Sequence, residues 1–154
     1  MERKNLIKII ITIISILVVA VLGSVFVGLG MDWFDSLIKP MQWVPNIVFP
    51  IVWTVVYLSF GVVLSVWIIK SRIPRNIIVL LVVNGILNVL WCLTFFTLQL
   101  TFLGNVVIVL NVIAGFALFV AIYNTRKVYA LITIIYPIWI AIATTLNTAL
   151  WILN

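Results

Sequence analysis

The chain has 154 residues, of which 66% are hydrophobic and 8% are charged. Soluble domains carry about 25% charged residues, so this composition excludes a soluble protein and indicates a multi-pass membrane protein. The formal net charge is +6, but all nine Lys and Arg residues lie outside the apolar runs, which favours control of membrane topology over nucleic-acid binding. The sequence has no His and one cysteine, Cys92, so we expect no metal site, and an intramolecular disulfide is excluded.

The first predicted element is an apolar run at residues 9–30, which follows three basic residues. Its length of about 22 residues exceeds the 7–15 apolar residues of a signal peptide, so we interpret it as a transmembrane helix. Ser24 and Gly28 form a pair of small residues four positions apart. This pair predicts close approach to a second helix, or reflects only the high frequency of glycine in membrane helices.

Residues 31–46 are the longest predicted segment that does not span the membrane. Pro40, Pro45 and three charged residues exclude a spanning helix, although residues 32–38 are compatible with a short interfacial turn. A loop of about 15 residues is long enough to fold back over the helices, so we expect a lid.

Four more apolar runs follow, and each is long enough to cross a bilayer. They cover residues 47–69, 76–98, 102–123 and 128–153. We expect Trp67, near the end of the first of these runs, to anchor its helix at the membrane interface. The sequence therefore predicts an all-α integral membrane protein, a five-transmembrane-helix bundle in which residues 1–154 form a single membrane domain.

The basic residues predict the orientation of this bundle. Three lie in the N-terminal tail, three within residues 70–75 and two at residues 126–127, whereas the opposite side has only Lys39. By the positive-inside rule, the N-terminus faces the cytoplasm, and the lid-like loop and the C-terminus face outward.

Aromatic and amide side chains share one face on three of the predicted helices. At about 100° per residue, these faces contain Phe49, Trp53 and Tyr57; Asn84, Asn88 and Trp91; and Tyr136, Trp139, Ala143 and Asn147. Counted in helical turns, Trp53, Asn88 and Trp139 lie at similar depths in the outer half of the membrane, beneath the loop. This convergence predicts a ligand pocket with aromatic walls. Spacing alone leaves helix packing open, because Asn commonly hydrogen-bonds across membrane helices and Trp gathers near interfaces.

Several multi-residue motifs follow one another within residues 23–151. They are Trp33-Phe34-x-x-Leu37-x-Lys39-Pro40-x-x-Trp43-x-Pro45, Phe49-Pro50-x-Val52-Trp53-Thr54-x-x-Tyr57, Asn88-x-x-Trp91-Cys92-x-x-Phe95-Phe96, and Tyr136-x-x-Trp139 with Ala143-Thr144-Thr145-Leu146-Asn147. Together they resemble the translocator protein family, also called tryptophan-rich sensory proteins, in its bacterial form. The resemblance favours the ligand pocket over simple packing.

This resemblance implies a five-helix bundle in the bacterial cytoplasmic membrane, usually a homodimer, with no required cofactor. It also implies binding of protoporphyrin IX and of synthetic isoquinoline carboxamide and benzodiazepine ligands. The matching positions that would surround the ligand are Trp43, Pro45, Trp53, Tyr57, Asn88, Trp91, Trp139, Ala143 and Leu146. Phe49 and Asn84 join this set because they share helical faces with its members.

Two positions depart from the family pattern. Asn46 stands where the family has the second proline of Trp-x-Pro-Pro, which leaves the conformation of the loop open. Residues 146–154 lack the Tyr and Arg of the animal cholesterol motif. We therefore do not expect cholesterol binding through that motif, and the looser match at residues 120–126 is too permissive to restore it.

The predicted spans contain no Asp, Glu, Lys, Arg or His, so a carboxylate acid–base pair, a proton relay and an ion-coupled carrier lack their usual groups. Without His, a metal-free porphyrin is the better expected ligand than haem. Two main functions follow from the resemblance: a receptor or sensor for tetrapyrroles, and a light- and oxygen-dependent porphyrin-degrading enzyme with Trp53 and Trp139 as catalytic residues. A tetrapyrrole or lipid transporter is a weaker third, because no coupling residue is visible.

The remaining small residues suggest packing roles. We expect Cys92 to be a small core residue. Ala114, Ala117 and Ala121 form a methyl-lined stripe that suits a close helix crossing, either in the implied homodimer or within one bundle.

Overall fold

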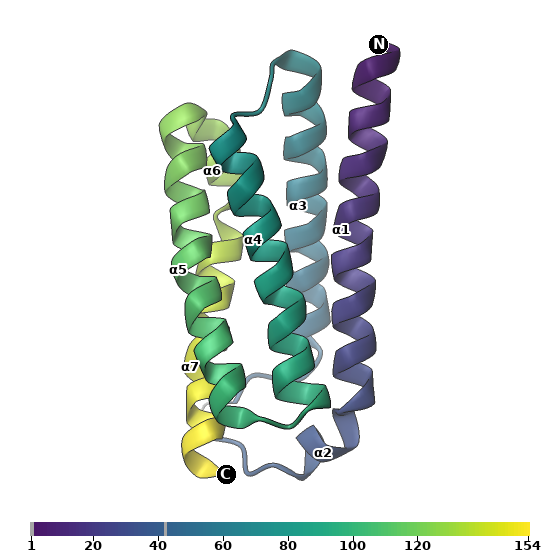
Figure 1. The fold of residues 1–154 in the computed structure, drawn as a ribbon. Helices are drawn as coiled ribbons and strands as arrows, with labels where there is room; N and C mark the ends of the chain where they lie inside the picture. The colour runs from purple at the N-terminus through teal and green to yellow at the C-terminus, as the bar shows by residue number, and fades with distance from the viewer. Residues whose placement is uncertain (1, 42) are drawn as a thin grey trace.

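The fold is a bundle of long helices without strands in the part of the chain that the computed structural model describes, residues 2–41 and 43–154 (Figure 1). Five helical spans in this part are long and apolar enough to cross a membrane. They consist of α1 (Arg3–Leu29), α3 (Val48–Lys70), α4 (Arg75–Cys92) with the π-helical turn η1 (Leu93–Thr97), α5 (Thr101–Thr125), and α6 (Lys127–Thr133) with α7 (Ile135–Leu153). The predicted all-α membrane bundle is confirmed.

The two ends of the bundle differ in charge. The N-terminus and the α3–α4 and α5–α6 turns lie at one end, which we call the basic end (Figure 1). The short helix α2 (Met31–Ser36), the loop that follows it and the C-terminus lie at the other end, which we call the loop end. Gln42 of the predicted lid lies outside the described residues.

Helical structure extends beyond two of the predicted boundaries. α1 begins at Arg3 and not at residue 9, because Lys and Arg are good helix formers whose long side chains can reach the membrane surface. α2 occupies the first part of the predicted loop 31–46, and its Phe34 is buried. The predicted lid is therefore a short packed helix followed by an irregular segment.

The third span ends in a wider turn than the predicted regular helix 76–98. Leu98 N donates to the Leu93 carbonyl, five residues back, at 2.9 Å. Gln99 then adopts a left-handed φ of 57°, which reverses the chain toward α5. Phe95 and Phe96, neighbours within this π turn, are both buried. Such turns are rare and frequently occur at functional sites.

The fifth span is interrupted at Ile134, between α6 and α7, where the sequence predicted a continuous helix 128–153. Pro137 lacks the amide hydrogen that would bond to the Thr133 carbonyl, and its ring crowds that carbonyl. The break therefore follows from the proline, which the prediction did not take into account.

Trp67 does not anchor the protein at the membrane interface, and that prediction is wrong. Its side chain is 1% exposed, and its ring centre lies 5.1 Å from that of Tyr129. α6 packs against α3 at this end of the bundle. Protein therefore encloses the indole where the sequence suggested lipid headgroups.

α4, α5 and α7 form the closely packed side of the bundle (Figure 1). Two glycines of α5 leave no room for a side chain: a Cβ at Gly115 would overlap Ile140 Cδ1, and one at Gly104 would lie 2.7 Å from Phe95 Cβ. Small residues allow membrane helices to approach closely and gain van der Waals contact, which matters because lipid tails are as apolar as the helices.

Buried amides and a tyrosine connect these three helices near their middle. Tyr136 Oη lies 2.9 Å from Asn84 Oδ1 and 3.1 Å from Asn111 Oδ1, and its single proton is donated to one of them at a time. Asn84 Nδ2 also donates to the Ala114 carbonyl at 3.2 Å. Asn84 of α4 is thus bonded to α5 and α7, and Tyr136 of α7 is bonded to α4 and α5.

A second set of hydrogen bonds joins the same helices nearer the loop end. Trp91 Nε1 donates to Asn147 Oδ1 at 3.0 Å, and Asn147 Nδ2 lies 3.4 Å from Asn105 Oδ1, which also accepts from Thr148 Oγ1 at 2.8 Å. Each such bond between membrane helices contributes about 0.6–2 kcal/mol. Polar bonds as well as packing therefore stabilise this side.

α1 packs more loosely than the other spans. Gly23 is the one fully buried residue among the described residues of α1. The loop end of the helix is held where Thr97 Oγ1 donates to the Phe26 carbonyl at 2.8 Å. Beside this bond, Gly30 lies so close to η1 that an added Cβ would overlap the Phe96 carbonyl.

Substitution of Gly30 tests this contact. Gly30→Ala should destabilise the protein, because the new methyl group overlaps backbone atoms that cannot rotate away. We expect a loss of about 1–3 kcal/mol of unfolding free energy, measured as a lower midpoint of thermal unfolding in detergent. Gly28→Ala is the matched control, since a Cβ there meets no atom within 4 Å. Equal midpoints for the two variants would contradict the close approach.

Candidate ligand-binding cavity

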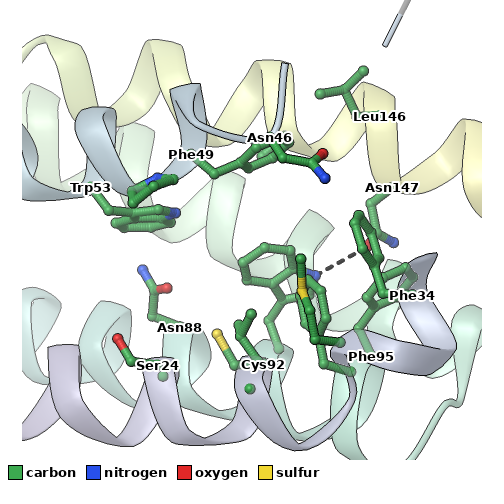
Figure 2. Close-up of a pocket in the computed structure, with 18 of the residues that line it drawn as sticks. Ser24, Phe34, Asn46, Phe49, Trp53, Asn88, Cys92, Phe95, Leu146 and Asn147 are labelled. Carbon is green, nitrogen blue, oxygen red and sulfur yellow. Dashed lines mark hydrogen bonds between the residues drawn. The ribbon is translucent and has the colours of Figure 1, made fainter. Parts of the chain in front are cut away.

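A cavity of about 410 Å³ lies at the loop end of the bundle, between α1, α3, α4 and α7 (Figure 2). We call it the loop cavity. Its volume falls within the range of about 300–1,000 Å³ that is typical of small-molecule sites. The described residues that line it include no Asp, Glu, Lys or Arg. A ligand here would meet mainly apolar and aromatic surface.

α3 supplies an aromatic wall, as the four-residue spacing of its rings predicts. Phe49, Trp53 and Tyr57 all line the cavity. The rings of Trp53 and Tyr57 stack with centres 5.6 Å apart and planes at 27°. Trp43 of the loop stacks on Phe49 at the same separation and angle. The wall therefore continues from the helix into the loop.

α4 and η1 supply the facing wall (Figure 2). Asn88, Trp91, Cys92 and Phe95 line it, as expected for residues that share one helical face. Trp91 lines the cavity, and its Nε1 donates to Asn147 Oδ1, the dashed line in Figure 2. The hydrogen bond that connects α4 to α7 thus also orients a cavity ring.

Small residues form the sides between these walls. Ala143 lines the cavity from α7, and Gly23, Ser24 and Gly28 line it from α1. A Cβ at Gly23 would lie 3.5 Å from Cys92 Sγ, but a Cβ at Gly28 would meet nothing within 4 Å. The Ser24 and Gly28 pair therefore borders empty space, where one reading of the sequence predicted close helix approach.

Asn88 is the polar group best placed to bind a ligand. Its side chain is 6% exposed and lines the cavity, facing Trp53 in Figure 2. The hydroxyl of the nearby residue Tyr136 bonds instead to Asn84 and Asn111, and no hydrogen bond of the Asn88 side chain is found among the described residues. The Asn88 amide therefore offers two donors and one acceptor to a ligand.

The loop that covers the cavity is fixed partly by Asn46. Trp43 Nε1 donates to Asn46 Oδ1 at 3.1 Å, and both residues line the cavity. A proline at position 46 has no side-chain acceptor for this bond. The departure from the family motif thus provides a side chain that orients Trp43.

Two other contacts hold the same loop. Lys39 Nζ donates to the Phe34 carbonyl at 3.2 Å and lies 3.9 Å from Asp35 Oδ1. Ile38 N donates to Asn154 Oδ1 at 2.9 Å, and Asn154 Nδ2 donates back to the Ile38 carbonyl at 3.1 Å. The loop is therefore attached both to α2 and to the residue that follows α7.

Three of the predicted site residues, Pro45, Asn84 and Trp139, are absent from the lining of the loop cavity. The Pro45 carbonyl accepts from Val48 N at 2.9 Å, where α3 begins. Asn84 lies one helical turn from Asn88 toward the basic end, and its amide is occupied by the bonds to α5 and α7 described above. Asn84 therefore serves helix packing in this structure.

Trp139 lies behind Phe49, with ring centres 5.4 Å apart and planes at 72°. Its side chain is 5% exposed, and its Nε1 has no hydrogen-bond partner among the described residues. Helical spacing placed Trp139 at the depth of the pocket, but spacing does not show which of two rings lies in front.

The motifs and helical spacing did not predict the cavity lining from α2 or any of the lining from α1. Met31 and Phe34 line the cavity from α2, and Ala20 and Val27 line it from α1. Phe34 was visible within the first aromatic motif, whereas Ala20 and Val27 carry no signal that separates them from lipid-facing residues.

Within the described residues, no group of three His, Cys, Asp or Glu side chains is arranged to hold a metal ion.

Comparison with known proteins agrees with the motifs. The profile of the TspO/MBR family matches residues 11–152. The chain is 32% identical to the Tryptophan-rich protein TspO of Archaeoglobus fulgidus, over 97% of this chain and 99% of that protein. It is 31% identical to Protein CrtK of Rhodobacter capsulatus, over 79% and 78% of the two chains. It is 30% identical to the Tryptophan-rich protein TspO of Chlorobaculum tepidum, over 90% of each.

Asn154 offers a test of the loop attachment. Asn154→Leu removes both hydrogen bonds to Ile38, so the backbone amide of Ile38 should exchange with solvent about three- to tenfold faster, as expected for the loss of about 1 kcal/mol of hydrogen bonding. Hydrogen–deuterium exchange with mass spectrometry measures this change. Asn124→Leu, an exposed site at the basic end, is the control. Unchanged exchange at Ile38 would show that the loop is held without Asn154.

Proposed function

Because the chain belongs to the TspO/MBR family, we propose that this multi-pass membrane protein is a receptor or sensor that binds a tetrapyrrole such as protoporphyrin IX in the loop cavity. The observation that supports this proposal most directly is the aromatic wall of Phe49, Trp53 and Tyr57 opposite the Asn88 amide. A flat, largely apolar macrocycle can stack on such rings, and a polar group of the macrocycle can form a hydrogen bond with the Asn88 amide.

The same lining supports binding of the synthetic ligand classes. Isoquinoline carboxamides and benzodiazepines combine fused aromatic rings with an amide carbonyl. Their rings would stack on the wall that Trp43 and Phe49 continue, and the carbonyl would accept from the Asn88 amide. These ligands should therefore compete with the porphyrin for one cavity.

We also propose that the protein is a homodimer with its N-terminus in the cytoplasm. The basic end carries the tail and turn residues that the positive-inside rule places in the cytoplasm. Ala117 of the predicted stripe is exposed on α5, while Ala114 and Ala121 are half-buried. The exposed part of the stripe leaves space for a second helix to approach.

Filling the cavity tests the binding site. Wild-type protein should show saturable quenching of Trp fluorescence at micromolar protoporphyrin IX. Gly28→Phe projects a ring into the loop cavity and should weaken binding at least about tenfold, or about 1.4 kcal/mol. Gly61→Phe is the matched control, because a Cβ at Gly61 also meets nothing within 4 Å, but Gly61 lines no part of the cavity. Equal affinity of both variants and the wild type would place the porphyrin elsewhere.

A second candidate function, light- and oxygen-dependent degradation of the bound porphyrin, is favoured by one observation. Trp53 borders the cavity directly and is stacked on Tyr57, so a bound macrocycle would contact an oxidisable ring backed by a second one. Trp139, the other predicted catalytic residue, is separated from the cavity by Phe49. The geometry therefore favours Trp53 as the residue that contacts the substrate.

Illumination of the complex distinguishes these two functions. If the protein degrades the porphyrin, light and oxygen should convert it to a new absorbing species, measured by its visible spectrum. Trp53→Phe keeps an aromatic ring in the wall, so binding should persist while conversion slows about tenfold or more. Trp139→Phe should slow conversion less, because its ring lies behind Phe49. Identical conversion by wild type and both variants would reduce the protein to a passive host for the porphyrin.

A further inference from the structure

A second and larger cavity lies toward the basic end of the bundle. It has a volume of about 880 Å³, is bounded by α1, α3 and α4, and we call it the basic groove. Lys8 of α1 and Arg72 of the α3–α4 turn mark its outer end. At its inner end it reaches Trp53, Tyr57 and Asn88, which also line the loop cavity. The walls between these ends are mostly apolar.

The two cations at the mouth have no acidic partner within the described part of the chain. The sequence contains three acidic residues: Asp32 and Asp35 lie at the loop end, and Glu2 lies at the basic end, directly before α1. The one ion pair among the described residues joins Asp35 to Lys39, also at the loop end. Glu2 forms no ion pair with either cation, so Lys8 and Arg72 carry positive charge without a paired carboxylate among the described residues, beside an apolar groove.

The groove is accessible from the lipid side and is long enough for an acyl chain. Its lining on α1 runs from Lys8 to Leu22, which corresponds to about 21 Å of helix. One leaflet of a bilayer has a hydrocarbon depth of about 15 Å. Leu22 of α1 and Val82 and Ile86 of α4 line the groove and are exposed, so the space between the helices opens sideways.

We propose that the basic groove binds one anionic phospholipid of the surrounding membrane. Its phosphate group lies at Lys8 and Arg72, and one acyl chain lies along the groove between α1 and α4. A zwitterionic phospholipid presents the same chain, but its own cation offsets the attraction of the phosphate to these two residues. The proposed headgroup position at Lys8 and Arg72 lies at the end of the groove away from Trp53, Tyr57 and Asn88, the residues that the groove shares with the loop cavity.

The test measures lipid retention by the full-length protein. Protein reconstituted with equal amounts of phosphatidylglycerol and phosphatidylcholine of identical acyl chains is extracted and analysed by native mass spectrometry. We expect one phosphatidylglycerol to remain bound in preference to phosphatidylcholine. Lys8→Gln combined with Arg72→Gln should reduce that preference about tenfold. Arg126→Gln combined with Lys127→Gln removes equal charge from the same end outside the groove and should leave the preference unchanged.

A second variant tests the site of the acyl chain separately from the site of the headgroup. Ser15 is exposed and lines the groove, so Ser15→Phe should fill part of the chain site and reduce retention while both cations remain. Glycerol 3-phosphate and inorganic phosphate, which lack the chain, should not displace the lipid at millimolar concentration. Thermal unfolding in detergent checks that each variant is folded.

Three results would overturn the proposal. Equal retention of the two lipids would remove the role of the cations. An equal loss of preference in the two double variants would assign the effect to the general charge of this end. If the monomer retains the lipid but the dimer does not, a second copy of the protein covers the groove in the dimer, and a lipid does not.

Discussion

Hydrogen bonds made by buried asparagine side chains are the constraint on which the rest of this structure depends. In the hydrocarbon core of a membrane no water is available to hydrogen-bond an amide that lacks a protein partner. The hydrogen bonds of Asn84 and Asn147 therefore fix α4, α5 and α7 relative to one another. Gly115 allows the backbones to come close enough for these short side chains to meet. One side of the bundle is thereby rigidly specified.

α3 is attached to the bundle by a different kind of contact. No side-chain hydrogen bond among the described residues joins it to another helix; aromatic pairs such as Phe60 with Tyr136 and Trp67 with Tyr129 hold it instead. At the loop end, α1 faces the space between α3 and α4 with small residues such as Gly23 and Gly28, which do not fill it. The loop cavity is a consequence of this arrangement, and it meets the basic groove at Trp53, Tyr57 and Asn88.

Much of the candidate site follows from helical periodicity. The rings of Phe49, Trp53 and Tyr57 form one wall because they recur every four residues, and the family resemblance of the motifs is confirmed by the match over most of the chain. Periodicity does not predict which residue lines the cavity where two residues share a helical face or lie at the same depth. Asn84 and Asn88 are one turn apart on α4, yet only Asn88 lines the loop cavity, because α5 and α7 occupy the amide of Asn84.

The sequence by itself determined the class of protein, the five spans, the basic end and the aromatic face of α3, because hydropathy, charge and periodicity are properties of neighbouring residues. The tertiary structure decided which aromatic rings reach the cavity, as with Phe49 in front of Trp139, and which are enclosed by protein, as with Trp67. It also decided where empty space remains, as beside Gly28. These outcomes depend on distances between helices that are remote in sequence, and no local pattern encodes such distances.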